Sequence, residues 1–95
     1  MKEKIIGDIL EFVEHPEYKG EWIAHWRGYT VATAAVKDNG TVDITEWHPD
    51  QESTRYSNAA SLDAAWRRIK NYTLTDFDDE LREHLAPGQG FRTKL

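Results

Sequence analysis

Four histidines are the side chains of this chain most able to do acid–base or metal chemistry: His15, His25, His48 and His84. His25 and His48 are expected at strand ends with carboxylates nearby, a set of groups that could ligate a metal ion. No two histidines have the close spacing of a known metal-binding motif, so surface histidines are the preferred interpretation. The sequence therefore predicts no metal site.

An acidic run, Asp-Phe-Asp-Asp-Glu at positions 76–80, superficially suggests a calcium loop. Such a loop needs glycine at its sixth position and glutamate at its twelfth. Leu81 and Pro87 stand at those two positions. The acids are better explained as the first turn of a helix, where the helix dipole favours negative charge.

Nucleophilic catalysis finds little support in the residues available. The chain has no cysteine, and Ser53, Ser57 and Ser61 all lack the Gly-x-Ser-x-Gly setting of a nucleophile elbow. No glycine-rich phosphate loop is present, and a domain this small rarely forms the concave pocket that chemistry needs. We therefore expect a non-enzymatic protein without catalytic residues and without a cofactor.

The aromatic residues are a better candidate for a site. Trp22 and Trp26 lie four residues apart on a predicted strand and so share one face. One sheet face cannot easily bury every aromatic side chain here, and exposed tryptophan and tyrosine are enriched in binding hot spots. The predicted partner-binding residues are Trp22, Trp26, Tyr29 and Trp47. The other interpretation, which the pattern slightly favours, is that these side chains simply form a large core.

A basic helix face provides an alternative site. The residues concerned are Arg55, Arg67, Arg68 and Lys70. Together with aromatic residues on the sheet, they could bind single-stranded nucleic acid through charge and base stacking. The net charge of −5 argues against this, because affinity for phosphate backbones depends on Lys and Arg that displace counterions. A solvated helix face is the preferred interpretation.

Composition places these candidates in one small protein. Ninety-five residues make one domain, and no apolar run approaches the roughly 20 residues that a membrane span needs. Asp8 and Glu11 interrupt what would be the apolar region of a signal peptide. Together with the absence of cysteine, this predicts the cytoplasm and no contact with a membrane.

The elements that position these residues are predicted to form an α+β fold. Ile5, Ile6, Ile9, Leu10, Phe12 and Val13 share one arc at helical spacing, which predicts an N-terminal helix that Pro16 stops. A three-stranded antiparallel meander should follow, with strands Glu21–Arg27, Tyr29–Val36 and Thr41–Trp47. Gly28 and Asn39-Gly40 mark its turns. Thr54–Ser57 is a candidate fourth strand.

Two helices are predicted to end the fold, packed on or beside the sheet. One runs from about Leu62 to Asn71 after Ser61 as N-cap, and the other from Asp76 to about Leu85 after Thr75. The small Ala32 and Ala34 leave room for a helix to pack on the sheet. The single domain should span residues 1–86, with a flexible tail over 87–95.

The function expected from these patterns is a small protein-binding domain. Its partner should be another protein or a second copy of the chain, and an origin in a phage or mobile element would make that partner a host protein. Nucleic-acid binding through the basic helix face is the alternative.

Overall fold

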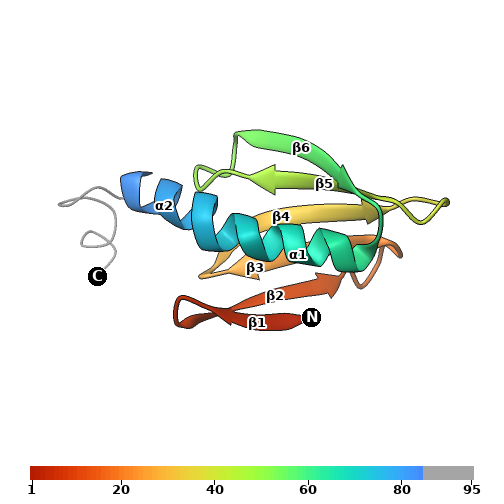
Figure 1. The fold of residues 1–95 in the computed structure, drawn as a ribbon, viewed down its shortest axis with the longest axis horizontal. Coiled ribbons are helices and arrows are strands. Elements are labelled where there is room, and N and C mark those ends of the chain that lie inside the picture. Colours follow the sequence, from red (N-terminus) through yellow and green to blue (C-terminus); the bar gives the residue numbers. More distant parts are fainter. Residues whose placement is uncertain (85–95) are drawn as a thin grey trace.

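The computed structural model describes residues 1–84, which form one antiparallel sheet followed by a helix (Figure 1). The elements are β1 (Lys2–Ile5), β2 (Asp8–Glu14), β3 (Glu21–Trp26), β4 (Tyr29–Val36), β5 (Val42–Trp47), β6 (Thr54–Ala59), α1 (Leu62–Tyr72), the π-helical segment η1 (Thr73–Phe77) and α2 (Asp78–His84). The predicted domain boundary at residue 86 and the tail over 87–95 lie outside the described residues.

The predicted N-terminal helix is wrong, because residues 2–14 form the β1–β2 hairpin. Its turn consists of Ile6 and Gly7, with φ angles of 47° and 82°. Two consecutive positive φ angles are typical of a type I′ turn, whose twist matches that of the paired strands. Arg27 and Gly28, at 53° and 79°, connect β3 to β4 in the same way.

Both faces of the β1–β2 hairpin carry apolar residues, which explains the helical pattern. Leu10 and Phe12 are fully buried beneath the helix, whereas Ile9 and Val13 lie on the opposite side and are 51% and 37% exposed. Alternation of apolar and polar residues, the usual sign of a strand, is therefore lost. The same six apolar residues also fit a helical arc, and the sequence pattern alone could not separate the two.

The six strands follow one another in the sheet in sequence order, so each pairs with its neighbours along the chain. β4 keeps its predicted bounds of Tyr29–Val36, and the predicted fourth strand is present as β6. The sheet therefore has six strands where three, or at most four, were predicted. β1 and β6 form its two edges.

One continuous helical run replaces the two separate helices that were predicted. Ser61 caps α1 as expected, because its hydroxyl accepts a hydrogen bond from the Ala64 amide at 3.1 Å. Thr75 is not a cap: it lies inside η1, and its hydroxyl donates to the Asn71 carbonyl at 2.8 Å. The chain thus passes from α1 through a π-helical turn directly into α2.

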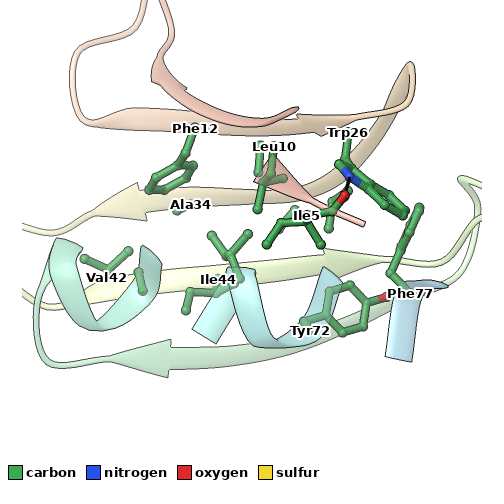
Figure 2. Packing of buried hydrophobic residues seen from close by; sticks show 14 of the residues in the cluster. Ile5, Leu10, Phe12, Trp26, Ala34, Val42, Ile44, Tyr72 and Phe77 are labelled. Atoms are coloured by element: carbon green, nitrogen blue, oxygen red, sulfur yellow. Dashed lines mark hydrogen bonds between the residues drawn. The ribbon is translucent and has the colours of Figure 1, made fainter. Parts of the chain in front are cut away.

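The helix covers one face of the sheet, which we call the inner face, and encloses the core (Figures 1 and 2). Ala32 and Ala34 are buried there beneath α1, so a helix does pack over these small residues. Trp26 is fully buried, and its indole Nε1 donates to the Ile5 carbonyl at 3.1 Å. This bond ties the N-terminal hairpin to the core.

Arg27, in the β3–β4 turn, anchors α2 to the same end of the sheet. Its guanidinium donates to Asp8 at 2.6 Å and to the Ile6 carbonyl at 2.9 Å, and it lies 3.6 Å from the buried carboxylate of Asp78. Arg82 also pairs with Asp78 from the next turn of α2. Asp78, the first acid of α2, therefore neutralises two arginines.

Within residues 1–84, no helix has the length and apolar character required to cross a membrane.

Candidate functional surface

The face of the sheet opposite the helix, which we call the outer face, is covered by no other element of the described chain (Figure 1). Strand register places one row of side chains across it from β2 to β6. The row consists of Val13, Ile23, Thr33, Thr45 and Tyr56. Side chains two or four residues apart on a strand share a face, which adds Ile9 and Trp47 to this surface.

Three of these outer-face side chains are strongly exposed: Tyr56 at 77%, Ile9 at 51% and Val13 at 37%. Single exposed apolar residues are ordinary on proteins, and only contiguous apolar surface indicates binding. Here Val13 pairs directly with Ile23, and Thr45 pairs directly with Tyr56. The row therefore forms one continuous band across the sheet, which is apolar on β2 and β3, threonine on β4 and β5, and aromatic on β6.

Trp47 lies on the outer face, half-buried against β4. Its indole Nε1 donates to the Thr33 hydroxyl at 3.4 Å. Trp47 is thus partly exposed on the outer face, and Thr33 of the neighbouring strand holds its ring.

The other three predicted partner-binding residues belong to the inner side. Trp26 is fully buried, and Trp22 packs on Phe12 with ring centroids 5.2 Å apart. Tyr29 meets Phe77 edge-on at 5.8 Å. The structure therefore separates the predicted set and leaves Trp47 alone on the uncovered face.

Sequence reasoning missed Ile9, Val13 and Tyr56 as members of this surface. Ile9 and Val13 were assigned to the apolar arc of a helix, which concealed their exposure. Tyr56 lies on β6, where the sequence showed only a short candidate strand. A turn signal was available in Ile6-Gly7, because glycine readily adopts the positive φ of a type I′ turn.

The charges around the outer face are mixed in sign and partly paired. Lys2 lies 3.5 Å from Glu11, and Lys37 lies 3.2 Å from Asp43. Shallow hollows between β4, β5 and β6 share Asp43 and Thr45 in their walls. The surface is therefore a band of apolar, threonine and aromatic side chains with shallow hollows, and charged residues such as Glu11 and Asp43 lie beside and within it.

The basic residues of the alternative site are largely occupied within the molecule. Arg55 Nε donates to Glu46 at 2.8 Å, and Arg68 Nε lies 3.3 Å from the same carboxylate. Asp76 accepts a further bond from Arg55 at 3.2 Å. The hydrogen bonds to Glu46 and then to Asp76 raise the pKa of Arg55. Glu46 itself is only 1% exposed, so two arginines hold one buried carboxylate.

Lys70 is engaged as well, because its Nζ lies 3.2 Å from Glu3 of β1 and 5.2 Å above the Trp66 ring. Arg67 is exposed and forms no ion pair with any residue between 1 and 84. The predicted basic patch thus consists of three residues held in internal ion pairs and one solvated arginine.

A second candidate is a hollow beside the β5–β6 loop and α2, lined by His48, Pro49, Asp50, Glu80 and Glu83. His48 Nδ1 contacts the Glu80 carboxylate, an arrangement that orients an imidazole in acid–base catalysis. Among residues 1–84, however, no three His, Asp or Glu side chains are grouped closely enough to hold a metal ion.

The hydroxyl of Ser53 near this hollow donates to Asp50 at 2.9 Å and not to His48, so the imidazole does not activate it. Asp50 closes the loop by accepting the backbone amides of Ser53 and Glu52 at 2.9 and 2.8 Å. These bonds lower the pKa of Asp50 to about 2. Asp50 and Ser53 therefore use these hydrogen bonds to close the turn, which explains their geometry without a catalytic role.

Comparison of the chain with family models, with curated proteins and with solved structures gives no match.

Proposed function

We propose that this protein is a small non-enzymatic module that binds another protein through the outer face of its sheet. The supporting observation is the band from Ile9 and Val13 to Trp47 and Tyr56, which crosses the sheet and has no covering element among the described residues. A nearly flat face of this kind suits a protein surface better than a small molecule, which needs a concave pocket.

The charge layout favours a protein over a nucleic acid. Three of the four basic residues expected to contact phosphate are bound to Glu46, Asp76 or Glu3. Releasing them would cost those ion pairs, and the net charge of −5 repels a polyanion at longer range. We further propose that the protein acts in the cytoplasm. If it is the product of a phage or mobile element, its partner is a protein of the host cell.

The proposal is tested with two charge variants on opposite sides of the molecule. Ile9→Lys/Val13→Lys adds lysines to the outer face, and Leu74→Lys replaces a residue of η1 that is 50% exposed. All three positions are exposed, so each substitution should change the free energy of unfolding by about 1 kcal/mol or less, and at Ile9→Lys part of that cost comes from Lys4, which stands directly opposite. Circular dichroism and urea denaturation verify this before binding is compared.

Each tagged protein is used to capture partners from a nuclease-treated extract of the source cells. The proposal expects a specific protein that the unchanged chain and Leu74→Lys retain and that Ile9→Lys/Val13→Lys loses. A protein that all three forms retain equally, a partner lost only in Leu74→Lys, or binding that disappears with nuclease treatment would contradict it.

A further inference from the structure

The two edges of the sheet differ in how well they are protected against further strand pairing. Edge strands present unpaired backbone groups, which proteins commonly shield with charges or by keeping the strand short. β1 has four residues, of which Lys2, Glu3 and Lys4 are charged. β6 has six residues and one charge, Arg55, whose guanidinium is directed to Glu46 and Asp76 on the inner side.

The ladder between β5 and β6 shows which backbone groups of β6 point away from β5. The His48 amide donates to the Ser53 carbonyl at 3.0 Å, and these two residues stand opposite each other in the register. Hydrogen-bonded and non-bonded pairs alternate along an antiparallel ladder. The residues of β6 that direct their N–H and C=O groups away from β5 are therefore Thr54, Tyr56 and Asn58.

We propose that two copies of this chain associate by antiparallel pairing of their β6 strands about a two-fold axis at Tyr56. In this register Tyr56 stands opposite Tyr56 of the second copy, and Thr54 stands opposite Asn58. All the outward-directed backbone groups then join in about six hydrogen bonds, two for each pair. Arg55 faces Ser57, so no like charges are opposed along the strand.

The same operation at β1 is unfavourable. The Phe12 amide donates to the Met1 carbonyl at 2.8 Å, so the outward-directed residues of β1 are Lys2 and Lys4. A two-fold axis at Glu3 would place Lys2 of one copy directly opposite Lys4 of the other on the same face. Like charges in directly opposed positions destabilise a strand pair. Self-association through β6 is therefore more favourable than self-association through β1.

Pairing through β6 would join the two sheets into one, with both helices on the same side and both outer faces on the other. The two bands proposed to bind a partner would become one longer surface, with the two Tyr56 side chains at its centre. This inference extends the proposed function but does not depend on it, because the strands can pair whether or not the outer face binds another protein.

Cysteine cross-linking tests the register directly, because the chain contains no cysteine of its own. Residues of a hydrogen-bonded antiparallel pair have Cα atoms about 5.5 Å apart, within the range that a disulfide spans. Tyr56→Cys should therefore oxidise to a linked dimer. Tyr18→Cys is the matched control, since Tyr18 is also exposed, at 58%, but lies in the β2–β3 loop. Equal cross-linking of the two variants, or none in either, would overturn the proposal.

Sedimentation of the unchanged chain should show a monomer–dimer equilibrium at about 10–100 µM, because one strand pair is smaller than the roughly 1,200 Å² of a standard interface. Tyr56→Pro removes an N–H that faces away from β5 and should weaken the dimer about tenfold or more relative to Tyr56→Ala, which keeps it. Equal weakening by both variants, or a monomer throughout this range, would contradict β6 pairing.

The two proposals can fail separately. Ile9→Lys/Val13→Lys should lose the captured partner and keep the dimer, since β2 lies away from the β6 edge. A dimer that this variant abolishes and Tyr56→Pro preserves would place the self-contact on the outer face and overturn the β6 register.

Discussion

The buried carboxylate of Glu46 and its two arginines lead to an asymmetric prediction about stability. Glu46 is 1% exposed, whereas the side chains of Arg55 and Arg68 are 50% and 43% exposed. If the arginines are removed, the carboxylate is left without a partner in the interior. If the carboxylate is neutralised, the two arginines can turn to water. The cost of losing the arginines should therefore be much the larger.

Methionine in place of both arginines keeps most of the apolar stem and removes only the charge. A buried charge that loses its partner typically costs about 3–5 kcal/mol, so Arg55→Met/Arg68→Met should lower the free energy of unfolding by about that much. Glu46→Gln keeps the shape of the side chain and should cost about 1 kcal/mol. The triple variant should recover most of the loss, because no unpaired charge then remains under the helix.

Urea denaturation followed by tryptophan fluorescence measures all four proteins, and Arg67→Met serves as the control with an expected change within about 0.5 kcal/mol. A loss of 3 kcal/mol corresponds to a melting temperature lower by roughly 12 °C or more in a domain of this size. A double variant that loses less than about 1 kcal/mol, or a triple variant less stable than the double, would refute the reasoning.

Three further predictions concern single groups. Trp26→Phe should cost about 1–3 kcal/mol in urea denaturation, because the indole hydrogen bond to the Ile5 carbonyl and part of the buried ring are lost; an unchanged midpoint would contradict this. The lowered pKa of Asp50 means that its carboxylate stabilises the fold above its ordinary value of 3.8, and that this contribution is lost as the pH falls through about 2. NMR titration should show the carboxyl midpoint near 2, and Asp50→Asn should lose less stability than the unchanged chain between about pH 4 and 2. The hydroxyl of Ser57 is buried with no hydrogen-bond partner among the described residues, so Ser57→Ala should be neutral or stabilising by up to about 1 kcal/mol, and a clear loss would reveal a hidden partner.

The central part of the fold could be predicted from sequence because its turn and strand signals agree. Gly28 separates two runs of Trp, Tyr, Thr and Val, and Asn39-Gly40 separates the next two. The predicted bounds of β4 are correct, and Ser61 is the N-cap of α1. At each of these positions the residue type strongly favours one backbone conformation, so the sequence predicts it correctly.

The N-terminal hairpin could not be predicted, because its strand β2 is apolar on both sides. Leu10 and Phe12 face the core, and Ile9 and Val13 face the uncovered side. Period-two alternation requires one polar face, so a strand with apolar residues on both faces lacks the pattern by which strands are recognised. The error in the fold and the omission of Ile9 and Val13 from the candidate site have the same cause.

The prediction of two separate C-terminal helices was wrong for a different reason. Residues 73–77 combine threonines with an acidic start, which is typical of a cap and a new helix. In the structure Thr73 and Thr75 donate instead to the carbonyls of Ile69 and Asn71, and the backbone continues as a π-helical turn. Tertiary packing of Phe77 against Trp26 and Tyr29 accompanies that continuation.

The strictly sequential order of the six strands has a consequence for how the chain folds during synthesis. Each strand can pair with the one made just before it, and such local pairing favours rapid folding for a sheet of this size. The helix that covers Leu10, Phe12 and Ile44 is synthesised after all the strands. Until residues 62–77 leave the ribosome, both faces of the growing sheet present apolar side chains to solvent. We therefore expect release of the C-terminal helix, and not formation of any hairpin, to end the period in which the nascent chain is prone to aggregate.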